Sequence, residues 1–182
     1  MSRISLIDIQ QNPQHASQPT LAEITGAFGG APNMFRAVAH SPATLRSLWG
    51  SFAALGQGSL PAKLTEQLAV AVAQRNGCEY CLAAHTALGR KAGATAAEMS
   101  HAQLGGSDDP ATAAALAFAL AVVDKRGRVG DEDIAALKAA GFSDEQLVEL
   151  LGHVALNLFT NYVNNALNTP LDFPAVAFQR AA

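Results

Sequence analysis

The chain has 182 residues, which is enough for one domain with a full-sized hydrophobic core or for two small domains. Hydrophobic residues make up 49% of the sequence and charged residues only 15%, so little charge remains to cover an isolated monomer. We therefore expect another copy of the chain to cover some apolar surface. The net charge of −3 and the lack of a basic cluster argue against nucleic-acid binding.

The N-terminal segment contains no apolar run of the length that a secretory signal needs, and no other stretch reaches transmembrane length. We therefore expect a cytoplasmic protein without membrane contact. In that reducing compartment, two cysteines close together in sequence indicate redox or metal chemistry rather than a permanent disulfide.

An N-terminal arm is predicted over residues 1–20, where the sequence is polar and contains two prolines and several glutamines. A single helical domain is predicted over residues 21–182. It begins with a helix from Leu21 and continues with a short helical segment over 34–40, for which Asn33 is the expected N-cap. Ser41 is the expected cap of the next helix, which should end near residue 55.

The second half of the chain also has the helical period and clear stop signals. Pro61 should start an apolar helix that Gly77 ends, and the cysteine-containing stretch should open the next helix. Further helices are predicted over residues 96–103, 110–125, 131–140 and from the Ser143 capping box to about 167. No segment shows the alternation of a β-strand, so the predicted fold is all-α.

A weak internal similarity joins TEQL at 65–68 to DEQL at 144–147, each at the start of an apolar helical run. It is compatible with an internal duplication whose second copy serves as a scaffold. In that register, the residues opposite Cys78, Cys81 and His85 are Asn157, Thr160 and Asn164.

Both cysteines of the protein lie in the stretch RNGCEYCLAAH, residues 75–85. On a helix beginning near Cys78, Cys81 lies about 60° from it and His85 about 20°, so all three share one face. The unpaired N–H groups and the dipole of the first turn favour a thiolate there. The two sulfurs can close a disulfide, and the histidine can accept or return a proton.

Glu66 is a further candidate, in the helix that precedes the cysteines. Antiparallel packing through the short turn at 75–77 would bring it near His85, where it could orient the imidazole and hold its proton. The alternative is that this acid only complements the dipole of its own helix.

Other interpretations of these residues stay open. The cysteines could be small core residues, or Cys78, Cys81 and His85 could bind zinc, although a structural site needs a fourth ligand that the sequence does not offer. We predict no metal and no cofactor. His153 forms a polar stripe with Asn157 and Asn161, which is more typical of a structural network than of a site. Tyr80 could be a wall facing the substrate or a packed aromatic.

The arrangement of Glu66, eleven residues, the CEYC of 78–81, three residues and His85 resembles the AhpD-like alkylhydroperoxidases of the carboxymuconolactone decarboxylase family. PNMFRAVAHSP at 32–42 and NLFTNYVNNALNTPLDFP at 157–174 resemble segments of its peroxidase-related branch, so the resemblance covers about residues 20–174. It implies an AhpD-like helical bundle that assembles as a homo-oligomer, a trimer or a hexamer.

The resemblance also implies the chemistry. Cys81 would attack a hydroperoxide, Cys78 would resolve the product as a disulfide, and Glu66 with His85 would relay protons. An external dithiol, such as a lipoyl group or a thioredoxin-like protein, would restore the thiols. AhpD itself has a histidine where this chain has Tyr80, and a phenol with a pKa near 10 shuttles protons poorly at pH 7. The expected function is a thiol-dependent hydroperoxide or disulfide reductase. The alternatives are a non-enzymatic redox sensor and a structural helical oligomer.

Overall fold

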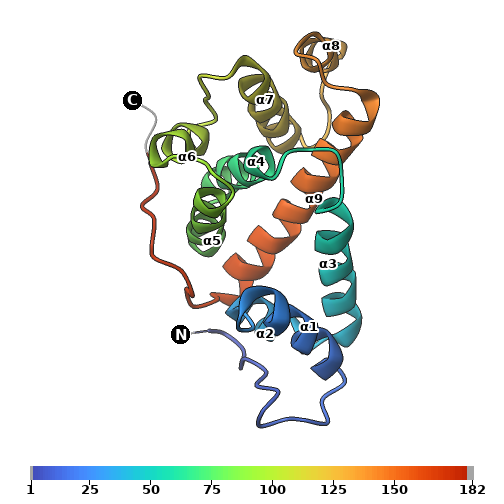
Figure 1. Cartoon of the computed structure of the whole chain (residues 1–182), viewed down its shortest axis with the longest axis vertical. Coiled ribbons are helices and arrows are strands. Elements are labelled where there is room, and N and C mark those ends of the chain that lie inside the picture. Colours follow the sequence, from blue (N-terminus) through green and yellow to red (C-terminus); the bar gives the residue numbers. More distant parts are fainter. Residues whose placement is uncertain (1, 180–182) are drawn as a thin grey trace.

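The computed structural model describes residues 2–179, and over this range the chain folds into nine helices and contains no strand (Figure 1). The helices are α1 (Gln18–Phe28), α2 (Asn33–Val38), α3 (Pro42–Leu55), α4 (Ala62–Arg75), α5 (Glu79–Lys91), α6 (Ala96–Gln103), α7 (Pro110–Asp124), α8 (Asp131–Ala139) and α9 (Asp144–Leu167). The predicted all-α class is confirmed. None of these helices has the length and apolar character that a membrane crossing requires.

Helix α4 lies at the centre of the bundle, with α5, α6, α7 and α9 packed around it (Figure 1). Every residue from Leu68 to Ala73 is buried, which leaves no polar face on this part of the helix. A helix surrounded on all sides must be apolar all round, as the run LAVAVA predicts. The central position of α4 makes it a fixed frame for the side chains near its start.

The local start signals locate most helices as expected. The Ser41 hydroxyl accepts the N–H of Thr44 at the start of α3, and a capping box opens α9 at Ser143. Helix α1 begins at Gln18, earlier than the expected Leu21, because Pro19 belongs to its first turn, where a proline fits.

The predicted cap of α2 is wrong. Pro32 is the N-cap and Asn33 is already helical, with no side-chain cap in place. The backbone N–H of Asn33 instead donates to the carboxylate of Asp172 at 2.7 Å. A tertiary contact from the C-terminal segment therefore satisfies the donor that a local cap would otherwise take.

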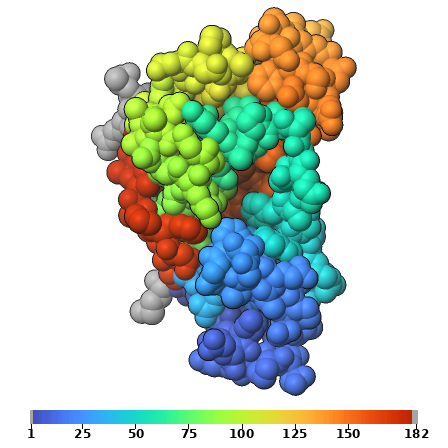
Figure 2. Space-filling view, viewed as in Figure 1, coloured from blue at the N-terminus to red at the C-terminus, as the bar shows by residue number. Residues whose placement is uncertain are grey.

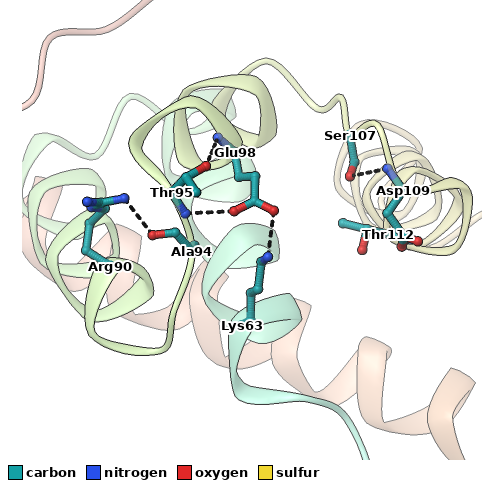
Figure 3. A network of polar contacts seen from close by, with 8 residues as sticks. All are labelled: Lys63, Arg90, Ala94, Thr95, Glu98, Ser107, Asp109 and Thr112. Atoms are coloured by element: carbon teal, nitrogen blue, oxygen red, sulfur yellow. Dashed lines mark hydrogen bonds and ion pairs between the residues drawn. The ribbon is translucent and has the colours of Figure 1, made fainter.

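A polar network joins the first turns of α6 and α4 (Figure 3). Thr95 and Glu98 form a reciprocal capping box, and the same Glu98 carboxylate accepts from Lys63 at 2.6 Å. Next to it, Asp109 caps α7 by accepting the N–H of Thr112 at 2.7 Å. The Lys63–Glu98 contact therefore joins the starts of α4 and α6, whereas Asp109 stabilises the start of α7 alone.

The C-terminal segment leaves α9 at Asn168, which adopts a left-handed conformation with φ 50°. It then runs along α5 and α6, where Figure 2 shows the red segment against the green surface. Gln179 ends this path by hydrogen bonding to Gln103 of α6 and to Gln74 of α4. The segment is therefore an integral part of the packed structure.

The internal similarity does not extend to the architecture. Residues 65–68 open a helix that stops at Arg75 before α5 begins, whereas residues 144–147 open the single continuous helix α9. No break in α9 corresponds to the turn at Gly77, so the α4–α5 pair is not repeated at that position.

Candidate functional site

The cysteines lie at the bend of a helical hairpin formed by α4 and α5. Gly77 makes the turn with φ 61°, a conformation that favours glycine, and the N–H of Cys78 donates to the carbonyl of Ala73 at 2.9 Å. Cys78 is the N-cap of α5 rather than its first residue, and its sulfur accepts the N–H of Cys81 at 3.2 Å. The two thiols are free, buried and within one turn of each other.

The hairpin brings Glu66 and His85 together, as the antiparallel packing predicts. Nδ1 of His85 lies 2.7 Å from a carboxylate oxygen of Glu66, and both side chains are mostly covered, with exposures of 14% and 21%. Gly89, one turn after His85, permits this approach, because a Cβ there would lie 3.3 Å from the Cβ of Glu66. Burial alone would lower the pKa of His85, but the charge and hydrogen bond of Glu66 raise it above its usual value.

Cys81 is 2% exposed, and polar donors surround its sulfur. The side-chain amide of Asn164, from α9, donates to it at 3.3 Å. The hydrogen bond from Cys78, the nearby positive charge of His85 and the amides of Asn164 and Asn161 outweigh burial and lower the pKa of Cys81 to about 7. Cys81 is therefore the sulfur best placed to be a thiolate at neutral pH.

Cys78 has the opposite character. Its hydrogen bond to the Cys81 sulfur and its complete burial raise its pKa well above the ordinary range. Cys78 also accepts a backbone N–H, which by itself favours the charged form, but Cys81 has the larger set of donors and faces His85. When the pair loses one proton, the remaining proton therefore stays on Cys78 and the negative charge lies on Cys81.

Tyr80 belongs to a contact that joins three parts of the chain. Its hydroxyl donates to Asp172 at 2.6 Å and accepts from the N–H of Met34, and its ring meets Phe173 edge-on. Burial and the Asp172 carboxylate raise the pKa of Tyr80. Its proton is committed to Asp172, so the tyrosine fixes the C-terminal segment against α2 and α5 and does not point a proton at the cysteines.

A small apolar pocket of about 50 Å³ opens onto Cys81 and His85, and we call it the front pocket. Its walls are mainly aromatic and aliphatic, and its four phenylalanines are Phe28, Phe35, Phe52 and Phe173. Tyr80 also lines it, so this side chain is both a packed aromatic and a pocket wall. The space holds little more than one or two water molecules, and a larger ligand requires side chains such as the half-exposed Phe28 to move.

A second cavity of about 270 Å³, the rear hollow, lies on the other side of the Glu66–His85 pair and also contacts His153 of α9. Nε2 of His153 is buried and has no hydrogen-bond partner among the described residues, and burial lowers the pKa of this histidine. The amide of Asn157 donates to the backbone carbonyl of His153 and not to its ring. The expected network of side chains therefore does not include the imidazole.

Asn164 and Asn161 are the residues of the site that sequence reasoning missed. Both are buried on α9, and a buried amide needs a hydrogen-bond partner. That burial pattern is the signal that could have identified them. The internal similarity placed Asn164 opposite His85, whereas the structure brings it to Cys81.

The described residues contain no group of three or more His, Cys, Asp and Glu side chains arranged to hold a metal ion. The surroundings of Cys81 are instead those of an activated thiol: the donating amide of Asn164, a neighbouring thiol and an imidazole paired with a carboxylate.

The fold and the site define an all-helical protein with a pair of thiols on a helical hairpin, and known proteins share this fold. Residues 42–125 match the model of the carboxymuconolactone decarboxylase family. A peroxidase-related protein from Ralstonia eutropha JMP134, described as an alkylhydroperoxidase AhpD core, superposes with a TM-score of 0.83 at 25% identity over 94% of this chain and 92% of its own. The central part of the chain thus resembles the carboxymuconolactone decarboxylase family, and the chain as a whole has the fold of an AhpD core.

Two further solved structures share the fold. A peroxidase-related protein from Silicibacter sp. TM1040 has a TM-score of 0.80 at 22% identity, over 93% of this chain and 91% of its own. The debrominase Bmp8, as a cysteine-to-alanine variant in complex with 2,3,4-tribromopyrrole, has a TM-score of 0.80 at 21% identity, over 94% of each chain. A comparison with curated protein sequences gave no match.

Proposed function

We propose that this protein is a thiol-dependent hydroperoxide reductase in which Cys81 is the attacking residue. The observation that carries the proposal is the environment of the Cys81 sulfur beside an apolar pocket, where hydrogen bonds from Cys78 and Asn164 and the charge of His85 lower its pKa to about 7. A thiol that is only a core residue needs none of these donors. The match of residues 42–125 to the carboxymuconolactone decarboxylase family supports the same class of chemistry.

The reaction consumes one hydroperoxide and two thiols. The Cys81 thiolate attacks the terminal oxygen of the substrate, the O–O bond breaks, and His85 supplies the proton with which the leaving alkoxide becomes an alcohol. Cys78 then attacks the sulfur of the Cys81 sulfenic acid, forming a disulfide and releasing water. An external dithiol, such as a lipoyl group or a thioredoxin-like protein, restores both thiols by exchange.

The front pocket favours an organic hydroperoxide over hydrogen peroxide. Its four phenylalanines would stabilise an alkyl or aromatic group but offer nothing to a second hydroxyl. A substrate whose apolar group fills the pocket would also lie next to the proton donor, because His85 lines the front pocket. Glu66 lies behind His85, next to the rear hollow. The reducing dithiol or solvent would supply the proton that restores the imidazolium after each turnover, and Glu66 would hold that proton on His85.

A second candidate function is the reductive removal of bromide from an aromatic ring. The aromatic walls of the front pocket favour it, and Bmp8 has the same fold. In this reaction one C–Br bond and two thiols would be converted into one C–H bond, hydrogen bromide and the disulfide. Release of bromide ion from a bromopyrrole would distinguish this reaction from peroxide reduction.

The decisive experiment is intact mass of the reduced protein after brief exposure to one equivalent of an organic hydroperoxide. We expect rapid loss of two hydrogens in the parent and gain of one oxygen in Cys78→Ser, because the sulfenic acid of Cys81 then has no resolving thiol. Cys81→Ser is the matched control and should not react. Equal reactivity of that control would rule out Cys81 as the attacking residue.

Turnover separates the enzyme from a redox sensor. With a dithiol present, repeated consumption of hydroperoxide is expected, whereas a sensor would be oxidised once and stop. If both cysteines remain reduced after exposure to hydroperoxide, with or without the dithiol, we would conclude that they are only packing residues of a structural oligomer.

A further inference from the structure

The two sulfurs of the pair differ, and this difference determines which of them a reductant attacks. In thiol–disulfide exchange the incoming thiolate bonds to one sulfur, and the sulfur that forms the more stable thiolate leaves faster. Cys81 is the better leaving group, because the amide of Asn164 donates to its sulfur at 3.3 Å and the charge of His85 lies nearby. The reductant should therefore attack Cys78, so its route through the protein has to lead to that residue.

The front pocket does not provide such a route. It has a volume of about 50 Å³ and opens onto Cys81 and His85, and Cys78 is not among the residues that line it. The exposed fractions of Cys78 and Cys81 are 0% and 2%, so a folded protein that presents its thiols on a broad surface does not reach either sulfur. The burial of the pair instead favours a slender dithiol that enters the structure beside Cys78.

A larger groove, which we call the side groove, shares Tyr80 and Asn164 with the front pocket. Its volume of about 690 Å³ is enough for a dithiol arm that the front pocket could not hold. Its lining includes both sequence neighbours of Cys78, which are Gly77 and Glu79, and the end of α9 with the segment after it contributes most of the rest. The side groove therefore lies at the bend of the hairpin, where Cys78 is located.

Two buried polar atoms at the side groove lack a hydrogen-bond partner. Oδ1 of Asn164 and Oγ1 of Thr169 have none among the described residues, although the two residues are only 3% and 8% exposed, and both residues line the groove. Buried polar groups are nearly always satisfied, so these two atoms indicate a ligand that carries an amide or hydroxyl donor. The amide of Asn164 already donates to Cys81, so a ligand held at Oδ1 would lie one side chain away from the cysteine pair.

We propose that the side groove is the binding site of the reductant, a slender dithiol that attacks Cys78 and not Cys81. The inference rests on the proposed function, because it concerns the step that regenerates the thiols. One thiolate of the reductant bonds to the Cys78 sulfur, the S–S bond breaks, and Cys81 leaves as a thiolate. The second thiolate of the reductant then attacks its first sulfur and closes the reductant's own disulfide, and the released Cys78 sulfur takes a proton from solvent. Substrate and reductant thus approach the pair through two different openings.

Attack on the buried sulfur of Cys78 requires part of the groove wall to move, and the segment after α9 is the part that can do so. Side chains join this segment to α5, through the hydrogen bond from Tyr80 to Asp172 and the edge contact of Tyr80 with Phe173. Such contacts can open locally while the helices stay folded. Entry of the reductant would therefore displace this segment and leave the hairpin in place.

The first test identifies the sulfur that is attacked. The disulfide is made with diamide, exposed briefly to the monothiol mercaptoethanol and trapped at once with iodoacetamide. Fragment masses of the peptide that contains both cysteines should show the mercaptoethanol adduct on Cys78 and the alkyl group on Cys81. An adduct mainly on Cys81 would overturn the proposal.

The second test fills the side groove. Glu79 is exposed and lines the groove, so Glu79→Trp should obstruct it and slow reduction of the disulfide by dithiothreitol about tenfold. Glu145→Trp is the matched control, because Glu145 is also an exposed acid in the first turn of its helix, and it should reduce at the rate of the parent. Circular dichroism checks that both variants are folded. Equal reduction rates for Glu79→Trp and the parent would contradict the proposed site.

Charge provides a third test, which does not depend on bulk. The attacking group is a thiolate, and the carboxylate of Glu79 repels it, so Glu79→Lys should speed reduction about threefold at low salt. The gain should disappear at high ionic strength, where exposed charges are screened. Glu145→Lys changes the net charge equally and should have no effect. A rate that Glu79→Lys leaves unchanged at low salt would show that the thiolate does not pass through the side groove.

The source of the disulfide separates this inference from the proposed function. Diamide forms the disulfide without hydroperoxide, so all three tests can be made whether or not the protein reduces peroxides. A parent that diamide oxidises and hydroperoxide does not would contradict the proposed function, whereas an adduct on Cys81 would contradict the reductant site. Faster reduction of the parent by a thioredoxin than by dithiothreitol would show that a folded protein does reach the pair, and would overturn the assignment to a slender dithiol.

Discussion

Asn164 shows how one side chain can control the chemistry of a residue 83 positions away. Its amide donates to the sulfur of Cys81 from inside the bundle, where a thiolate without donors would be unstable. The cysteine pair alone therefore does not make the site, because the amides of α9 complete it.

Replacing Asn164 with leucine keeps the approximate volume and removes the donor. We expect the pKa of Cys81 to rise by about one unit, as loss of a hydrogen bond to a charged group predicts. The pH dependence of iodoacetamide alkylation, followed by mass, measures this shift. Asn165→Leu is the control, since Asn165 is exposed and donates to the Asn76 carbonyl instead. An unchanged alkylation profile in Asn164→Leu would mean that this amide does not stabilise the thiolate.

Glu66→Gln tests the charge behind His85. The carboxylate raises the pKa of His85, so its loss should lower that pKa and remove the imidazolium near neutral pH. Cys81 then loses a nearby positive charge and its pKa rises above about 7. The reaction with hydroperoxide should be slower at pH 7, and its pH–rate curve should move to higher pH.

Glu79→Gln is the control for this change, because Glu79 is exposed and lies between Cys78 and Tyr80 in sequence. It removes the same charge close to the cysteines without touching His85. Identical pH–rate curves for Glu66→Gln and the parent would show that Glu66 only complements the dipole of its own helix.

At the scale of elements, the distance between α4 and α5 decides whether Glu66 reaches His85. Gly89 leaves no side chain between the two helices, and a Cβ there would collide with the end of Met99 of α6 and approach Glu66. The thioether can move aside, but Glu66 is fixed by the backbone of the central helix. A large residue at position 89 must therefore separate the helices.

Gly89→Leu should destabilise the protein by about 1–3 kcal/mol through overpacking and should raise the pKa of Cys81 by displacing the Glu66–His85 pair. Thermal unfolding and the alkylation profile measure the two effects. Gly50→Leu is the matched control, because Gly50 is also helical and a Cβ there meets nothing within 4 Å. Equal melting temperatures for the two variants would show that the approach at Gly89 is not tight.

The helices were largely predictable because their signals are local. Ser41, Ser143 and Gly77 mark helix ends by their own chemistry, and the turn at 75–77 is short enough to predict the contact between Glu66 and His85. The cap of α2 failed for the opposite reason, since its acceptor, Asp172, is distant in sequence.

At the scale of the whole molecule, the missed features all depend on how α9 and the segment after it pack on the rest of the bundle. Asn164 reaches Cys81, and Asp172 reaches Tyr80, only because the end of the chain folds back over the hairpin (Figure 1). The helical period shows that α9 has a buried face, but it does not say which helix that face meets. Distant contacts of this kind need the structure.

The donors around Cys81 also affect the energy of the oxidised protein. The amide of Asn164 and the charge of His85 stabilise a thiolate, and neither finds an equal partner in a neutral disulfide. Interactions that favour only the reduced state raise the reduction potential of the pair, at 30 mV for about 1.4 kcal/mol. The disulfide should therefore be strongly oxidising and should exchange readily with an incoming dithiol. The groups that activate Cys81 for attack would thus also favour its return to the thiolate.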